Sequence, residues 1–151
     1  MPSVLQPNVF VEAFVGNDKV NAQDLANALF DASPVPPARA SSLELCRAYE
    51  TLFGVVYDKL RLMVGHRGIM VSLHRAIRLT ACQHSVLEAL TITDTGIAFA
   101  AVRGQRPPAD PVVLHKAVSD LLTRFLDDLC LLIGADLLGV ILGCSVQSQR
   151  A

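Results

Sequence analysis

A chain of 151 residues has the length of one domain and can bury a continuous hydrophobic core. Hydrophobic residues make up 52% and charged residues 18%, against about 45–50% and about 25% in an average soluble domain, and the mean hydropathy is +0.42. The formal net charge of −1 argues against general binding to nucleic acid. The surplus of apolar residues predicts either helices buried on several sides or a surface covered by a second subunit or a membrane.

Membrane insertion and secretion are disfavoured. The most apolar run, from Leu129 to Val146, is interrupted by Asp136 and by three glycines, whereas a spanning helix needs about 20 apolar residues. The N-terminus, MPSVLQPNVFVEAFVGND, lacks the basic region and clean apolar stretch of a secretory signal. The cysteines form no C-x-x-C pair, which is typical of reduced, inert thiols. We therefore expect a cytoplasmic location.

The first 40 residues differ from the rest, so we predict an N-terminal arm over 1–40 and a helical domain over 41–151. Residues 8–15, NVFVEAFV, could form a short strand or an extended arm, and Asn21 to Asp31 fits a short helix. The three prolines of SPVPPARA, residues 33–40, require a loop. We treat this arm as an appendage that could be exchanged with a partner subunit.

The pattern from Ser41 onward predicts a long helix, a break and a second helix. Ser41 and Glu44 form a capping box, and the apolar residues that follow recur at spacings of three and four as far as about Val64. Gly65 and Gly68 bracket the predicted break. The predicted core positions of the first helix are Leu45, Tyr49, Leu52, Phe53, Val56, Leu60 and Met63, and those of the second are Ile69, Met70, Leu73, Ala76 and Ile77.

The C-terminal half repeats this plan. Residues 84–91 could form a short helix, residues 97–102 are too short to classify, and RGQRPPADP is a second loop. Asp110 then caps a long helix with Pro111 at its first position, and a last helix is expected from Asp136 to about Cys144. The core stripe of the long helix is Leu114, Val118, Leu121, Leu122, Phe125, Leu129 and Leu132.

Two segments of the sequence match at one constant offset. In LFGVVYDKLRLMVGHRGIMVSL and LLTRFLDDLCLLIGADLLGVIL, two aspartates, two glycines and several apolar positions coincide. We predict an all-α bundle built from two pseudo-symmetric units, each a helix, a glycine corner and a second helix. Gly134 then corresponds to Gly65, and both glycines are expected to cap a helix in left-handed geometry.

A basic stripe on the second helix is the main candidate binding site. At about 100° per residue, Arg67, His74 and Arg78 fall on one side, with Arg75 beside them and His66 at the start of the helix. The stripe could be a solvated face, a partner for Asp120, Asp127, Asp128 and Glu50, or a contact for phosphates, an acidic protein or a membrane surface. The loop VGHRGIM could present backbone N–H groups to an anion, although it matches neither common phosphate-binding motif.

Other chemistry has little support in the sequence. Cys82 and His84 form a C-x-H pair that would need His115 or another cysteine to complete a metal site. The serines and cysteines lack a recognisable nucleophile motif. We therefore predict no enzymatic activity, no cofactor and no metal.

The favoured function is a protein-interaction or regulatory module that forms a homodimer, in which surplus apolar surface on the first and fourth helices of the bundle is buried through something like a four-helix seam. One alternative is a small-ligand sensor with an apolar pocket between the helix pairs, gated by His66 and Arg67. A weaker alternative is binding of a membrane or an anionic partner through Arg67, Arg75 and Arg78.

Overall fold

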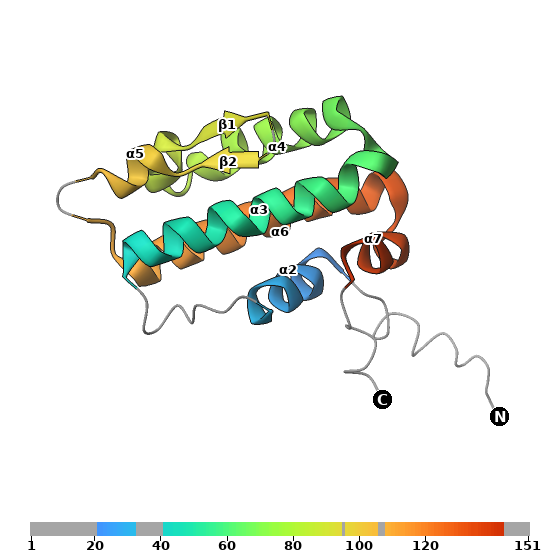
Figure 1. Ribbon diagram of the computed structural model, residues 1–151, viewed down its shortest axis with the longest axis horizontal. Helices are drawn as coiled ribbons and strands as arrows, with labels where there is room; N and C mark the ends of the chain where they lie inside the picture. The colour runs from blue at the N-terminus through green and yellow to red at the C-terminus, as the bar shows by residue number, and fades with distance from the viewer. Residues whose placement is uncertain (1–20, 33–40, 95, 106–107, 144–151) are drawn as a thin grey trace.

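Two long helices that run side by side in the same direction form the centre of the fold (Figure 1). In this computed structural model, which describes residues 21–32, 41–94, 96–105 and 108–143, they are α3 (Ser42–Val64) and α6 (Pro111–Ile133), each of 23 residues. On one side of this pair lie α4 (His66–Ala81), a hairpin and α5 (Ala100–Arg103). On the other side lie α2 (Ala22–Asp31) and α7 (Ala135–Leu142). The fold is therefore mainly α-helical, as predicted.

The predicted helix starts are confirmed. The Ser41 side chain accepts a hydrogen bond from the Glu44 backbone N–H at 3.2 Å, and the Glu44 carboxylate accepts one from the Ser41 N–H at 2.9 Å. The Asp110 carboxylate caps α6 by accepting from the Val112 N–H, with Pro111 in the first turn. These local bonds fix where both long helices begin.

The two glycine corners have nearly the same backbone geometry. Gly65 has φ 86° and ψ 153°, and Gly134 has φ 88° and ψ 147°. The positive φ agrees with the prediction, but ψ near 150° is not the left-handed helical value; it belongs to an extended region that is essentially restricted to glycine. Each corner turns the chain without a linker, because α4 and α7 start at the next residue.

Gly68 does not belong to the break, contrary to the prediction. It lies in the first turn of α4, where a Cβ atom would stand 2.9 Å from the Val64 Cγ1 atom. This glycine therefore lets the end of α3 approach the start of α4.

The core lies between the three layers and includes most of the predicted apolar positions. Met63 and Leu132 are exceptions, because they are 56% and 62% exposed at the ends of α3 and α6. Helix α2 is part of the core rather than an appendage, since Leu25 and Ala26 are fully buried and α2 packs on α6. The other predictions for the arm, a strand or arm over 8–15 and a loop over 33–40, concern residues outside the described ranges.

The segment between the two halves forms a small capping structure. A 3₁₀ helix, η1 (Ser85–Ala89), replaces the expected short helix and is followed by β1 (Thr91–Thr93) and β2 (Gly96–Ala98). The two strands pair antiparallel, with Ile92 opposite Ile97. The hairpin packs against α3, and one side of α4 has exposed residues from Arg67 to Leu79.

Candidate functional site

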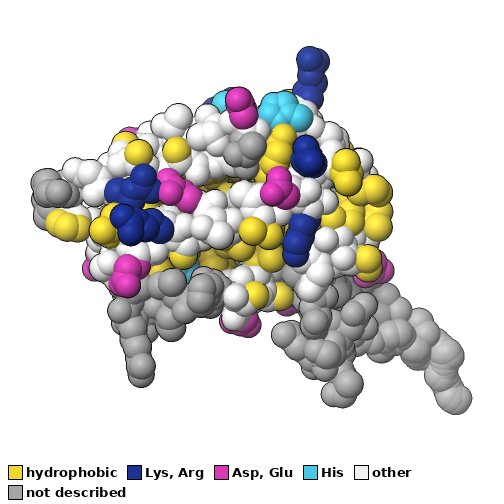
Figure 2. All heavy atoms as spheres, viewed as in Figure 1, with side chains coloured by type: hydrophobic (Ala, Val, Ile, Leu, Met, Phe, Trp, Pro, Cys, Tyr) yellow, Lys and Arg dark blue, Asp and Glu magenta, His cyan; other side chains and the backbone are white. Residues whose placement is uncertain are grey.

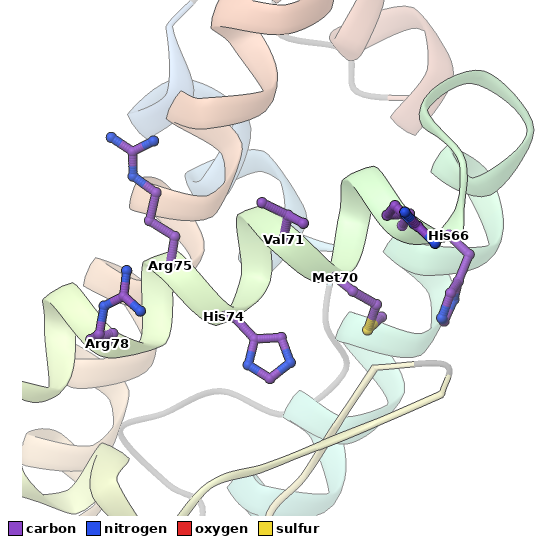
Figure 3. A pocket seen from close by; sticks show the side chains of 7 residues that line it. His66, Met70, Val71, His74, Arg75 and Arg78 are labelled. Carbon is purple, nitrogen blue, oxygen red and sulfur yellow. The ribbon is translucent and has the colours of Figure 1, made fainter.

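All five predicted binding residues lie along one open depression on α4. His66, Arg67, His74, Arg75 and Arg78 line a hollow of about 500 Å³ (Figure 3). Met70 and Val71 complete its lining, so the described part of the wall comes from α4 alone. We call these seven residues the α4 cationic face. The sensor hypothesis placed a pocket between the helix pairs, whereas this depression lies on the outer side of one helix.

The residues of the α4 cationic face differ in how they are held. The Tyr57 hydroxyl lies 2.7 Å from Nδ1 of His66, and the two rings meet edge to face. Nε of Arg75 lies 4.0 Å from Oδ2 of Asp128, beyond hydrogen-bond distance, and the Arg75 side chain is 62% exposed. Within the described part of the chain, no carboxylate lies within ion-pair distance of Arg67, His74 or Arg78. His66 is therefore partly structural, and the three other side chains are free to meet a ligand.

The acidic residues proposed as partners for the stripe mostly have other partners. Asp120 lies 2.6 Å from Nε2 of His84 and 3.7 Å from Nζ of Lys116. Glu50 binds Arg103 at 2.6 Å. Only Asp128 approaches the stripe, so the chain's own described carboxylates leave most of this face unneutralised.

A second surface, which the sequence did not locate, lies where the two glycine corners meet solvent. The ends of α3 and α6 and the starts of α4 and α7 come together at one end of the molecule (Figure 1), and Figure 2 shows hydrophobic side chains gathered there. We call this surface the corner patch; its residues, each more than half exposed, are Leu62, Met63, Val71, Leu131, Leu132 and Val140.

Contacts between the helices explain why these side chains are neighbours. Helix α4 runs antiparallel to α6, and Arg75 faces Asp128. Val71 lies one turn before Arg75 and Leu132 one turn after Asp128, so both reach the same end of the pair. On the other side, Nζ of Lys59 donates to the Leu142 carbonyl at 3.0 Å, which brings the end of α3 against α7.

Aromatic rings join α2, α3 and α6 away from the corners. The Tyr49 hydroxyl lies 2.7 Å from Nδ1 of His115, and the ring of Phe30 packs edge-on against both of these residues. Phe99 packs against Tyr49 from the segment after β2. We call Phe30, Tyr49, Phe99 and His115 the aromatic cluster. Burial raises the pKa of Tyr49 and lowers that of His115, so burial favours the neutral form of both side chains.

The cysteine and histidine pair suggested as a partial metal site is dispersed. His84 points to Asp120, His115 points to Tyr49, and the Cys82 thiol contacts the Arg78 carbonyl. Among the residues with described positions, no group of three metal-ligating side chains comes together. Burial also raises the pKa of Cys46 to about 11, so its thiol is a poor nucleophile.

In the part that the structure describes, no helix combines the length and apolarity that crossing a membrane requires. No family model matches the chain, and neither a curated protein nor a solved structure is detectably similar to it.

Proposed function

We propose that this protein is a non-enzymatic interaction module that forms a homodimer through the corner patch. The observation that carries the proposal is the exposure of Leu62 and Leu131, which are 87% and 84% exposed at the ends of the two central helices. Large apolar side chains that are almost fully exposed to water gain a favourable free energy when a partner covers them. A partner that covered them would remove this cost.

The area of the corner patch is suited to a protein interface. Taking about 100 Å² of exposed apolar surface for each of its six residues gives on the order of 600 Å². A standard stable interface buries about 800 Å² on each partner, so this apolar centre and a polar rim would suffice. Leu43, Val112 and Val113 are also exposed, but they lie at the opposite ends of the long helices and include fewer large side chains.

The internal repeat favours a second copy of the chain as the partner. At the same constant offset that relates Gly65 to Gly134, Leu62 corresponds to Leu131, Met63 to Leu132 and Val71 to Val140, and every member of these pairs is exposed. The buried positions correspond in the same way: Leu45 with Leu114, Tyr49 with Val118, Phe53 with Leu122, Val56 with Phe125, Leu60 with Leu129, and Ile69 with Leu138. Both sets of residues support the pseudo-symmetric two-unit arrangement.

A pseudo-twofold axis of this repeat would run along the central helices and leave the molecule through the corner patch. Each half of the patch would then present nearly the same apolar pattern. In an isologous interface the same patch of two copies meets, so each half of this patch would face an equivalent apolar half on the partner. The dimer expected here is therefore formed at the corners, and not along the sides of α3 and α6.

Sedimentation equilibrium of the wild type and of a Leu62→Gln/Leu131→Gln variant tests the proposal. We expect a dimer for the wild type and a weakening of at least tenfold for the variant, because two buried leucines contribute about 1.5–3 kcal/mol each. A Val112→Gln/Val113→Gln variant is the matched control, since it removes exposed apolar residues elsewhere. A monomeric wild type at 100 µM or more, or dissociation by the control alone, would contradict the proposal.

A further inference from the structure

The α4 cationic face presents its charges in a line. Arg67, His74 and Arg78 are separated by seven and four residues, which places them on one side of the helix. With a rise of about 1.5 Å per residue, the line from Arg67 to Arg78 is about 16 Å long, or three helical turns. Met70, which is half-buried, and Val71, which is exposed, lie between the charges.

The depression is too open to enclose a small molecule. Small-ligand sites bury most of the ligand surface, usually between several elements, whereas the described lining here belongs to one helix. An open groove of about 500 Å³ beside a line of charges is better filled by a row of side chains from another polypeptide. The apolar strip at Met70 and Val71 gives that polypeptide an uncharged anchor point.

A membrane surface fits this face poorly. A helix that lies in a membrane interface turns a large apolar side toward the lipid. In α4 the large apolar residues Ile69 and Leu73 are buried in the protein core. What remains outside on α4 is one valine and parts of Met70, Ile77 and Leu79, which is too little apolar surface for this helix to lie in a membrane interface.

Nucleic acid fits poorly as well. The formal net charge of the chain is −1, so no broad positive field surrounds this face. The residues of the depression include no Phe, Tyr or Trp on which a base could stack. The pattern of separated cations around a short apolar strip is instead the complement of an acidic amphipathic helix.

We propose that the α4 cationic face is a docking site for an acidic amphipathic helix of a partner protein. The partner carries Asp or Glu on both sides of a narrow apolar stripe, so that carboxylates meet Arg67, Arg75 and Arg78 while a Leu or Met side chain contacts Met70 and Val71. This inference goes beyond the homodimer and uses a different surface, because only Val71 belongs to both.

Fluorescence anisotropy with a labelled synthetic peptide tests the inference on the full chain. The probe is an 18-residue helical peptide with Glu on both sides of one Leu stripe, and its matched control has every Glu replaced by Gln. We expect binding that weakens at least tenfold between 50 and 300 mM salt, because exposed ion pairs are screened. The Gln peptide should bind at least tenfold more weakly than the Glu peptide.

Two charge variants of the protein locate the site. Arg67→Gln/Arg78→Gln should lose at least tenfold in affinity for the Glu peptide. Arg47→Gln/Lys116→Gln changes the net charge equally at exposed cations near the starts of α3 and α6 and should bind as the wild type does. Equal losses in the two variants, or no binding of the Glu peptide, would overturn the inference.

Three further measurements test other ligand classes and separate this inference from the homodimer proposal. Phosphatidylserine vesicles or a 20-nucleotide single strand that bound the wild type more tightly than the Glu peptide would also overturn the inference. The Leu62→Gln/Leu131→Gln variant should bind the Glu peptide at least as tightly as the wild type, since neither residue lines the depression and a monomer leaves Val71 uncovered. Failure of the homodimer proposal would therefore not weaken binding of the peptide.

Discussion

The aromatic cluster and the corner patch are built on the same two helices, but they leave their side chains in opposite states. Around Tyr49, rings pack on one another and the hydroxyl finds His115 at 2.7 Å. Around Leu62 and Leu131, large apolar side chains are more than half exposed and make few contacts within the chain. The aromatic cluster is buried within one chain and stabilises the fold. The corner patch would stabilise the protein only if a partner covered it, because apolar burial is then favourable.

The largest expected effect concerns the corners that hold the patch together. Gly65→Ala and Gly134→Ala should each destabilise the protein by about 2–3 kcal/mol, because residues with a Cβ atom are strained near φ 86° and ψ 150°. Chemical denaturation followed by circular dichroism measures this loss.

Gly54 provides the matched control for the corner glycines. It lies inside α3, where an added Cβ atom meets nothing within 4 Å, so Gly54→Ala should stabilise by about 0.5–1 kcal/mol. Equal changes in unfolding free energy at Gly54 and at the corners would show that the corner positions do not require the backbone conformation of glycine.

A smaller effect is expected beside the aromatic cluster. The Glu50 carboxylate accepts hydrogen bonds from the Phe99 backbone N–H and from Arg103, both at 2.6 Å, and so ties the segment after β2 to α3. Glu50→Ala should cost about 2 kcal/mol, since a partly buried N–H and a guanidinium both lose their acceptor. Glu88→Ala, at an exposed glutamate, should change the unfolding free energy by less than about 0.5 kcal/mol.

The Glu50→Ala variant also tests whether the region around Glu50 is coupled to the corner patch. The Glu50→Ala variant should keep the dimer affinity of the wild type, because the corner patch lies away from Glu50. A loss of dimerisation with normal folding would mean that the two regions are coupled.

The smallest effect is a dependence on pH. Burial lowers the pKa of His115 below its ordinary value of 6.5, so the unfolded chain binds a proton more readily than the folded one. The free energy of unfolding should therefore decrease as the pH falls from about 7 through the folded pKa. His115→Gln should remove this slope, measured by denaturation at several pH values, and an unchanged slope would assign it to other groups.

The sequence predicted the features that depend on local chemistry. The caps at Ser41 and Asp110 and the positive φ of Gly65 follow from residues a few positions apart, and the structure confirms them. The sequence could not predict that Met63 and Leu132 are exposed. The apolar stripe of a helix can continue beyond the last residue that a neighbouring helix covers, and the sequence does not show where that cover ends. The contact of Tyr57 with His66 was missed for a similar reason, since it depends on the angle of the corner.

The site was predicted in part. The positions of Arg67, His74 and Arg78 on one side of α4 follow from helical periodicity alone. Whether a helix side faces solvent or a neighbour depends on packing between distant segments, and the outer location of the depression could not be obtained from the pattern.

The hydrogen bond between Tyr57 and His66 has a mechanical consequence. It spans the first corner and links α3 to α4 by side chains, in addition to the backbone turn at Gly65. At the second corner the corresponding positions are Leu126 and Ala135, which cannot form such a bond. The first corner is therefore the stiffer joint, and the angle between α6 and α7 is the softer one, held from outside by Lys59.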